Sequence, residues 1–460
     1  MMKIEPMIQQ KEGRKMAETI KVGMVSLGCP KNQCDAELML AKIAKAGFKI
    51  VNEAGLADVV VINTCGFIQS AKEEAIEEIM EAINRKNDGI NKKIIVTGCL
   101  AERYQKQMDE EFPEVDAVIG IAKNDDIVEV INSVMLDKRV ISFGDKLCHN
   151  MEGDKLQSTL PHYAYLRIAD GCSNCCSYCA IPLIRGKMRS RKMENIIEEA
   201  KTFAQNGVKE LVIVAQDVTA YGIDLYKKYA LPELLKELCR IDGIKWIRLL
   251  YCYPERITDE LIETIKTEDK VLNYLDIPIQ HCNKEILKNM NRSGDEQSLR
   301  ELFTKLRREI PGIVLRTTLI TGFPGETEEQ FSELAEFVNE IKFERLGCFA
   351  YSAEEDTPAA EMPDQVDEGE RQRRADIIMG EQEIRMEEYY AGMVGETFEV
   401  VCEGFDRYSD MYFGRSMHFA PEIDGMIYFT SQKEKRPVIG DFISVKITDV
   451  LENNLLGEQV

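Results

Sequence analysis

The chain has no apolar run long enough to cross a membrane, and no apolar segment near its first residues of the kind that directs export. A membrane role and a disulfide framework are therefore not expected, although the chain holds 14 cysteines. We expect the reducing cytoplasm, where cysteines serve as metal ligands or as small buried apolar residues. Five cysteines that occur singly are expected to belong to the core: Cys239, Cys252, Cys282, Cys348 and Cys402.

Basic residues are scarce relative to acidic ones. The chain carries 58 Lys and Arg against 80 Asp and Glu, which gives a formal net charge of −22. Such a charge repels polyanions and attracts basic partners. It weakens the case for a nucleic-acid substrate, although a local basic patch can override the net charge. The length of 460 residues is sufficient for two or three domains with separate cores.

The sequence also lacks the second tight pair of cysteines or histidines that most structural zinc sites have. It has instead one C-x3-C-x2-C loop, formed by Cys172, Cys176 and Cys179. A four-iron cluster takes four thiolates, so three leave one iron for a ligand from elsewhere or for a small molecule. Cys175 permits a second register, in which the ligands are Cys172, Cys175 and Cys179. A zinc site or inert thiols remain the alternative to an iron–sulfur cluster.

Strand patterns alternate with helical patterns through the first third of the chain, after a polar stretch over residues 1–20 that we expect to be a disordered extension. This alternation predicts an α/β fold that begins with a doubly wound parallel sheet, in an N-terminal domain over residues 21–150.

Three more cysteines, Cys29, Cys65 and Cys99, each follow one of the first predicted strands, at separations of 36 and 34 residues. One strand–helix unit takes about thirty residues, and the carboxyl ends of parallel strands meet in one crevice. We therefore expect these thiols to hold a second cluster, with three buried structural cysteines as the alternative. Cys34 falls early in the first helix and is expected to serve packing.

Six further strand patterns separated by helices predict a partial (βα)6 barrel over residues 158–390, which ends in a charged helical connector. Short strands spaced by Gly and Asp over residues 391–460 predict a small antiparallel β-barrel. Because the active face of a βα barrel is the carboxyl end of its strands, the polar residues that follow the strands are expected to line one mouth: Gln216, Asp217, Glu255, Arg256, Gln280, His281, Thr321–Glu326 and Ser352–Asp356.

The ordered chain, about residues 21–460, resembles the methylthiotransferase family of radical S-adenosylmethionine (SAM) enzymes in its cysteine loop and domain order, and its last domain is similar to a TRAM barrel. This family has a ribosomal-protein branch and a tRNA branch. Segments similar to the ribosomal-protein branch are Ser26–Asn32, Ala215–Gly222, Tyr274–His281, Gly322–Thr327 and Ala420–Gly425. The resemblance implies that a methylthio group is added to the β-carbon of an aspartate in protein twelve of the small ribosomal subunit.

The resemblance also implies two [4Fe-4S] clusters and SAM as cofactors. The cysteine loop would hold the cluster that cleaves SAM, and the three cysteines after the N-terminal strands would hold the cluster that supplies sulfur. Cofactor contacts are implied for Tyr178, Gln216, Asp217, Gly322, Gly325 and Glu326. The last three have an alternative role, as a turn that precedes the next helix and caps it at Thr327.

Other polar residues near the site carry weaker predictions. Arg185, Arg189 and Arg191 follow the cysteine loop and either pair with carboxylates of SAM or substrate or are surface charges. His281 is one of four histidines and is expected to be structural.

The charge of the last domain indicates what kind of partner the chain binds. Residues 391–460 carry twelve acidic and six basic residues, a net charge of −6. A barrel that grips tRNA phosphates should be basic, so the acidic one favours a basic ribosomal protein, and tRNA binding is not expected. An electron donor such as flavodoxin or ferredoxin is expected. Two alternatives remain, methylthiolation of tRNA adenosine with the same clusters and a non-catalytic iron–sulfur electron carrier.

Overall fold

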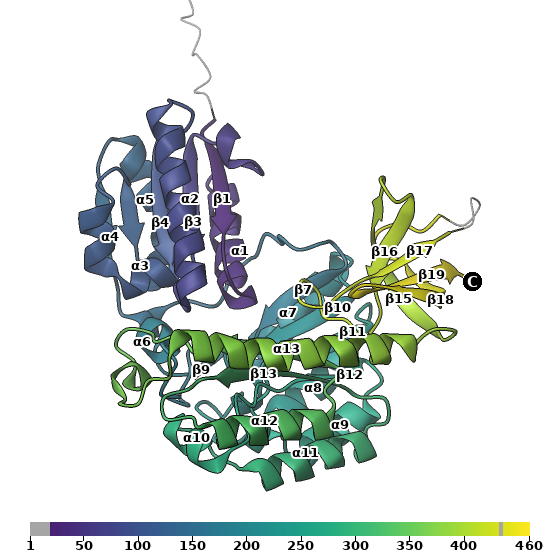
Figure 1. Cartoon of the computed structure of the whole chain (residues 1–460). Coiled ribbons are helices and arrows are strands. Elements are labelled where there is room, and N and C mark those ends of the chain that lie inside the picture. Colours follow the sequence, from purple (N-terminus) through teal and green to yellow (C-terminus); the bar gives the residue numbers. More distant parts are fainter. Residues whose placement is uncertain (1–18, 432–435) are drawn as a thin grey trace, which may run out of the picture.

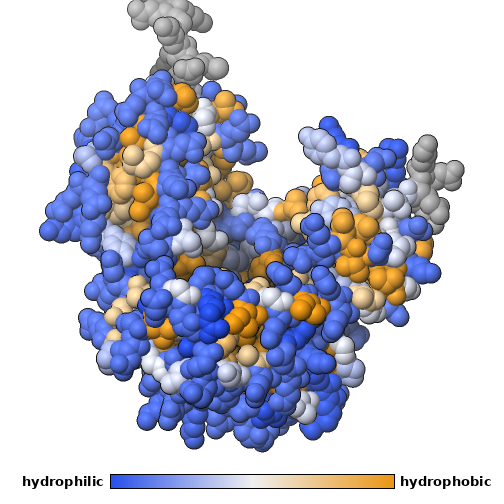
Figure 2. All heavy atoms as spheres, viewed as in Figure 1, coloured by the Kyte–Doolittle hydropathy of each residue, from blue (hydrophilic) through white to orange (hydrophobic). Residues whose placement is uncertain are grey.

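Two parallel sheets and a closed barrel follow one another along the chain (Figure 1). The computed structural model describes residues 19–431 and 436–460, so the extension expected over residues 1–20 lies almost wholly outside the described residues. Figure 2 shows that the first and last parts rise from the central one with a hollow between them. None of the helices in the described ranges combines the length and apolar character needed to span a membrane.

The N-terminal sheet has the strand order β2-β1-β3-β4-β5-β6 with all neighbours parallel, and it confirms the doubly wound fold. Residues of α1 and α5 cover one face of the sheet and residues of α2 the other. The elements are β1 (Lys21–Ser26), α1 (Pro30–Lys45), β2 (Lys49–Val51), β3 (Val59–Thr64), α2 (Gln69–Asn87), β4 (Lys93–Gly98), α3 (Cys99–Arg103), α4 (Gln105–Glu111), β5 (Ala117–Ile119), α5 (Ile127–Met135) and β6 (Val140–Ser142).

The central sheet is also parallel and six-stranded, in the order β14-β13-β12-β11-β10-β7. Its end strands, β7 and β14, do not pair with each other, so the barrel is partial as expected. The strands are β7 (Tyr163–Arg167), β10 (Glu210–Val214), β11 (Trp246–Leu249), β12 (Val271–Asp276), β13 (Val314–Thr321) and β14 (Arg345–Ala350), beside a short hairpin of β8 (Ala169–Asp170) and β9 (Arg189–Ser190). The helices are α6 (Ile181–Arg185), α7 (Met193–Gln205), α8 (Leu231–Cys239), α9 (Asp259–Thr267), α10 (Lys284–Asn289), α11 (Glu296–Glu309) and α12 (Glu328–Ile341).

The expected connector is a single helix, α13 (Glu368–Ala391), which runs across the central part in Figure 1 and packs on β13 and β14. The chain ends in a closed barrel of strand order β15-β16-β17-β19-β18. All its pairs are antiparallel except β17 with β19, so the expected barrel is confirmed with one parallel pair. Its strands are β15 (Thr397–Asp406), β16 (Met411–Arg415), β17 (Ile427–Thr430), β18 (Phe442–Leu451) and β19 (Asn454–Gln459).

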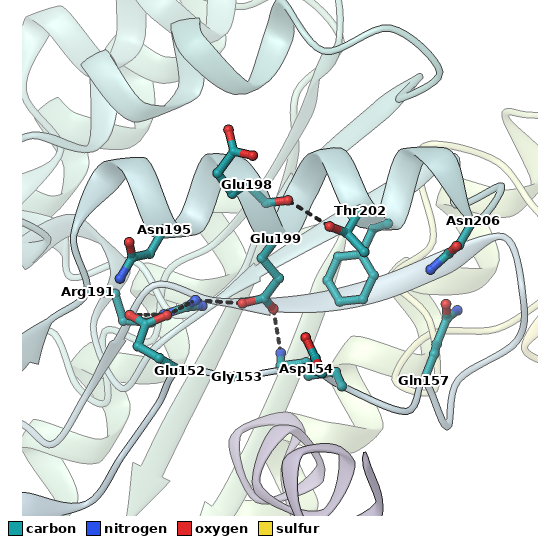
Figure 3. A pocket seen from close by; sticks show the side chains of 12 residues that line it. Glu152, Gly153, Asp154, Gln157, Arg191, Asn195, Glu198, Glu199, Thr202 and Asn206 are labelled. Carbon is teal, nitrogen blue, oxygen red and sulfur yellow. Dashed lines mark hydrogen bonds and ion pairs between the residues drawn. The ribbon is translucent and has the colours of Figure 1, made fainter. Parts of the chain in front are cut away.

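The segment between β6 and β7 joins the N-terminal sheet to the partial barrel. A buried ionic cluster ties this segment to both parts. The Lys155 ammonium lies 2.7 Å from the carboxylate of Glu199 on α7 and 4.0 Å from that of Glu37 on α1. Figure 3 shows Arg191 and Glu152 meeting near Glu199, and Arg191 pairs with both carboxylates at 2.6 Å. The joining segment is thus held against the barrel, which fixes the orientation of the N-terminal sheet.

A second buried cluster joins the C-terminal barrel to the central one. Glu210, at the start of β10, accepts hydrogen bonds from Arg248 at 2.7 Å and from Arg415 of the C-terminal barrel at 2.8 Å. Arg415 also pairs with Glu403, which is bonded to His162 at 3.0 Å. Burial alone would raise the pKa of Glu210, but the two guanidinium groups outweigh this effect and hold the pKa at about 2.

The depressed pKa predicts how acid weakens this interface. A carboxyl whose pKa is lower in the folded state adds stability above its unfolded pKa, near 4.5 for Glu210, and loses it as the pH falls through the folded value. We expect Glu210→Gln to lower the free energy of unfolding by about 3 kcal/mol at pH 7. Denaturant titrations should show this difference shrinking between pH 4.5 and pH 2, whereas a difference that is constant with pH would contradict the assignment. The control is Glu340→Gln, in an exposed pair with Arg300.

Candidate active site

One cavity of about 380 Å³ brings together all six cysteines that the sequence predicts as cluster ligands. It lies between the carboxyl edge of the N-terminal sheet and the mouth of the partial barrel. The residues that line it are Cys29, Lys31, Cys65, Phe67, Cys99, Cys172, Asn174, Cys176, Tyr178, Cys179, Ile181, Arg185, Gln216, Tyr251, Cys252, Tyr253, Pro278, Gln280 and Arg292. The two groups of thiols therefore share one chamber.

Cys29, Cys65 and Cys99 are brought together by close backbone packing at the ends of β1, β3 and β4. Gly28 has φ +85°, and a Cβ on it would lie 2.7 Å from the sulfur of Cys65. Gly98, with φ +96°, leaves no room for a side chain because the carbonyl oxygen of Thr64 would lie 2.4 Å from its Cβ. These two glycines allow the three loops to approach one another.

Two buried asparagines fasten the Cys29 loop to the Cys65 loop. The amide of Asn32 donates to the carbonyl oxygens of Leu27 at 2.8 Å and of Asn63 at 3.2 Å. Asn63 returns a bond from its amide to the carbonyl oxygen of Asn32 at 2.8 Å. The sequence analysis assigns no role to either asparagine. The Asn-Thr-Cys sequence at the end of β3 is the pattern from which the role of Asn63 could have been inferred.

The three thiols differ in acidity. Burial raises the pKa of Cys99 to about 12 and also raises that of Cys65. Burial would raise the pKa of Cys29 too, but Lys31, Arg185 and two backbone N–H groups at the start of α1 outweigh it and lower the pKa. Cys29 is thus the most readily ionised of the three, and metal ligation would deprotonate the others.

The cysteine loop lies between β8 and α6 and is anchored by its backbone. The N–H of Cys172 donates to the carbonyl oxygen of Gly186 at 3.1 Å, and that of Cys179 to Cys176 at 3.0 Å. Cys175 has φ +52°, is exposed and does not line the cavity. Its carbonyl oxygen accepts from the Asn291 amide at 2.8 Å. This geometry favours the register with Cys176.

The donor geometry also bears on the zinc alternative. Within the described part of the chain, no three Cys, His, Asp or Glu side chains converge as they would around a single metal ion. A four-iron cube takes one thiolate at each corner, so its ligands need not meet at one point. Two sets of three thiols that line one cavity would offer three ligands to each of two such cubes.

Arg185 connects the two groups of thiols. Its guanidinium is buried and lies 2.9 Å from Asp35, 3.0 Å from Asp170 and 3.5 Å from the sulfur of Cys99. Asp35 also pairs with Arg167. Arg185 is therefore an interior charge that joins α1 to the segment of the cysteine loop, and it is not a surface charge. Arg189 and Arg191 are likewise paired within the protein.

Removal of the Arg185 charge is expected to cause a large loss of stability. We expect Arg185→Met to lower the free energy of unfolding of the metal-free protein by about 3–5 kcal/mol, because it leaves Asp35 and Asp170 buried with fewer partners. Arg373→Met, which breaks exposed pairs with Glu328 and Glu370, should cost far less, because solvent screens exposed charges. Denaturant titration measures both, and equal losses would show that the Arg185 cluster is not coupled to the fold.

The predicted cofactor contacts divide into two sets. Tyr178 and Gln216 line the cavity, and Gln216 donates to Asp170 at 3.0 Å. Asp217 does not line it; its carboxylate pairs with Arg256 and accepts from Asn174, which does, at 3.0 Å. The cofactor roles themselves stay predictions.

Gly322, Gly325 and Glu326 do not line the cavity, and Gly322 and Glu326 lie against α13. Glu326 accepts hydrogen bonds from Arg374 at 2.7 Å and from the N–H of Gly322 at 3.0 Å. The next helix begins with a capping box at Thr327, as the alternative interpretation predicts. His281 is buried and accepts a bond from the N–H of Asn283 at 2.9 Å, in agreement with a structural role.

The structure adds site residues that the sequence did not single out: Lys31, Tyr251, Cys252, Tyr253 and Arg292. Cys252 was expected to be core, and it is buried but also forms part of the cavity wall. Arg292 donates to the carbonyl oxygen of Pro278 at 2.8 Å and lies 4.1 Å from the centre of the Tyr253 ring. Lys31 lies two residues after Cys29 in the sequence, whereas the packing of separate barrel loops brings the other four residues to the cysteines.

A buried ion pair holds the N-terminal sheet over the barrel mouth. Glu354, in the loop after β14, pairs with Lys72 at 3.1 Å and with Arg103 at 2.8 Å. Arg103 also donates to the carbonyl oxygen of Gly66, the residue after Cys65. The contact therefore closes the cavity beside the Cys65 and Cys99 loops.

Comparison with known proteins places the chain in a family. Three family descriptions match in succession: Uncharacterized protein family UPF0004 over residues 21–120, Radical SAM superfamily over residues 166–338 and TRAM domain over residues 394–460. The ribosomal protein uS12 methylthiotransferase RimO of Caldanaerobacter subterraneus subsp. tengcongensis is 50% identical over 438 residues, which cover 95% of this chain and 99% of that protein. The chain belongs to the RimO family of methylthiotransferases.

Further RimO relatives and solved structures agree with this placement. RimO of Clostridium botulinum strain Hall is 48% identical to this chain, and the aligned residues cover 96% of this chain and 98% of that protein. The structure of the radical SAM methyltransferase TsrM from Kitasatospora setae, with cobalamin and a [4Fe-4S] cluster bound, has a TM-score of 0.56 at 13% identity over 74% of this chain and 77% of its own. At this identity TsrM supports the fold alone. The RimO family and the radical SAM fold confirm the expected enzyme class.

Proposed function

We propose that this RimO-family chain adds a methylthio group to the β-carbon of an aspartate in ribosomal protein uS12, with two [4Fe-4S] clusters and SAM as cofactors. The observation that carries the proposal is the single cavity into which two groups of three cysteines face. The relatives at 48–50% identity over nearly the whole chain are named for uS12 methylthiolation.

The donor sets fit the two clusters. Cys172, Cys176 and Cys179 would hold one and leave a corner for SAM, and the cysteines after β1, β3 and β4 would hold the other. When bound, the first cluster supplies the electron that cleaves SAM and the second the position at which sulfur is delivered. These assignments rest on the placement of the thiols around the cavity.

The protein itself contributes shielding and position. The Glu354 ion pairs hold the N-terminal sheet against the barrel, so the reacting groups lie between two protein surfaces and away from bulk water. Arg185 places its positive charge beside Cys99 and is itself fixed by Asp35 and Asp170. The aromatic side chains of Tyr178, Tyr251 and Tyr253 form part of the cavity wall and restrict how a substrate enters.

The alternatives are less well supported. An electron carrier does not need one cavity lined by two three-thiol groups, and the chain belongs to an enzyme family. Methylthiolation of tRNA would use the same clusters, but the C-terminal barrel has a net charge of −6 and the relatives are named for a protein substrate. We propose in addition that a small electron donor such as flavodoxin or ferredoxin reduces the enzyme, and that tRNA is not bound.

The proposal is tested by incubating anaerobically reconstituted enzyme with SAM, a reductant and either uS12 or unmodified tRNA. Mass spectrometry should show a methylthio addition on one aspartate of uS12 and none on tRNA adenosine. Modification of tRNA, or SAM cleavage without any modification of uS12, would contradict the proposed function.

A further inference from the structure

The cavity has an unbalanced set of charges. Three of the residues that line it are cations, Lys31, Arg185 and Arg292, and none is an aspartate or a glutamate. The three cations suit anionic groups, which include the thiolates of the cavity as well as a carboxylate ligand, and they differ in how far carboxylates of the protein already neutralise them.

Arg185 is neutralised, because Asp35 and Asp170 lie within 3.0 Å of it. Lys31 is 6% exposed, and no carboxylate of the described residues lies within ion-pair distance of its ammonium group. The ammonium lies instead 3.5 Å from the centre of the Tyr251 ring. The thiol of Cys29 is an acidic neighbour, whose pKa burial would raise but Lys31 helps to lower. A buried cation without a carboxylate partner is costly, so Lys31 can still accept the carboxylate of a ligand.

The remaining cation, Arg292, belongs to the other side of the site. It lies against Tyr178 and Tyr253, and its strongest electrostatic neighbours include Cys176. Lys31 follows Cys29 by two residues and interacts most strongly with Tyr251 and Cys29. The two cations thus mark the SAM-cleaving and the sulfur-delivering sides of the cavity.

We propose that Lys31 binds the side-chain carboxylate of the aspartate that receives the methylthio group, an inference that rests on the proposed function. The reacting β-carbon is bonded directly to the carboxylate carbon. A cation that holds the carboxylate therefore fixes the reacting carbon one bond away. Because Lys31 adjoins Cys29, this contact places the β-carbon on the sulfur-delivering side.

The same contact would make Lys31 a specificity-determining residue. A carboxylate supplies the missing opposite charge, whereas the neutral amide of asparagine does not, and an uncharged adenine base would not either. Lys31 would thus select an acidic side chain among those that the cavity admits.

The test measures binding of uS12 to the reconstituted holoenzyme with SAM and without reductant. The second ligand is uS12 in which the accepting aspartate is replaced by asparagine. We expect the unchanged enzyme to bind the aspartate form roughly 10- to 100-fold more tightly than the asparagine form. Lys31→Met should bind both forms equally weakly, and Lys31→Arg should recover part of the preference. Lys45→Met is the control, because Lys45 lies exposed on the same helix.

Iron content and SAM cleavage without uS12 are measured on the same variants. Both should be unchanged in the Lys45→Met control, and Lys31→Met should hold as much iron as the unchanged enzyme if Lys31 contacts the substrate rather than the cluster. A preference for aspartate that survives in Lys31→Met, or a loss of iron in that variant, would overturn the proposal, the latter because the charge would then serve the cluster. When reductant is then added, an unchanged enzyme that binds uS12 but leaves it unmodified would contradict the proposed function instead.

Discussion

Replacement of Cys29, Cys65 and Cys99 together by alanine is expected to halve the iron content of the anaerobically reconstituted protein, from about eight irons per chain to about four. The cysteine loop is anchored by its own backbone bonds to Gly186 and within itself, so it should keep its cluster. The variant should therefore still cleave SAM but no longer methylthiolate uS12. Iron analysis, 5′-deoxyadenosine production and mass spectrometry of uS12 measure the three results.

The matched control replaces three cysteines that do not line the cavity: Cys34, Cys239 and Cys402. This control should keep about eight irons and the full activity. If the triple variant at the N-terminal sheet also keeps eight irons, the second cluster is held elsewhere, and if it loses SAM cleavage as well, the two sites are not separable.

Adjacent cysteines in the loop are expected to respond in opposite ways. Cys176→Ala should reduce SAM cleavage to background, because Cys176 lines the cavity and supplies one of only three thiols to its cluster. Cys175→Ala should retain cleavage, since Cys175 is exposed and contributes its backbone carbonyl to Asn291. The rate of 5′-deoxyadenosine formation by reduced enzyme measures the contrast.

Each of these two variants is the control for the other, because they alter neighbouring residues of one loop by the same change. The opposite result, loss of cleavage in Cys175→Ala and retention in Cys176→Ala, would establish the other register. Equal loss in both variants would indicate that the loop, rather than one thiol, had been damaged.

The fold was largely predictable because its two sheets are parallel and buried. Strand β3 is buried at every position, and its first four residues form a continuous apolar run in the sequence. The edge strands β2 and β6 give little signal in the sequence, because they have three residues each and none of those residues is fully buried. The parallel pair of β17 and β19 was also not foreseen, because β-barrel patterns do not specify strand order.

The cysteines of the site were predictable, whereas most of its other residues were not. Cys29, Cys65 and Cys99 follow strands at a regular spacing, and a parallel sheet turns that spacing into proximity. Arg292 reaches the site through tertiary packing between segments far apart in the chain. Glu354 lies in the segment Ser352–Asp356 that was expected at the barrel mouth, but its ion pairs with the N-terminal part were not predicted. Gly322 and Glu326 are the opposite case. The sequence implied that they contact the cofactor, but their motif after a barrel strand packs against α13 and does not line the cavity.

The crystal structure of the anaerobically reconstituted protein, with iron located by its anomalous scattering, tests the central claim most directly. The account predicts two four-iron cubes in one cavity, one bound by Cys29, Cys65 and Cys99 and the other by Cys172, Cys176 and Cys179. A single cube, or a second cube bound outside this cavity, would contradict it.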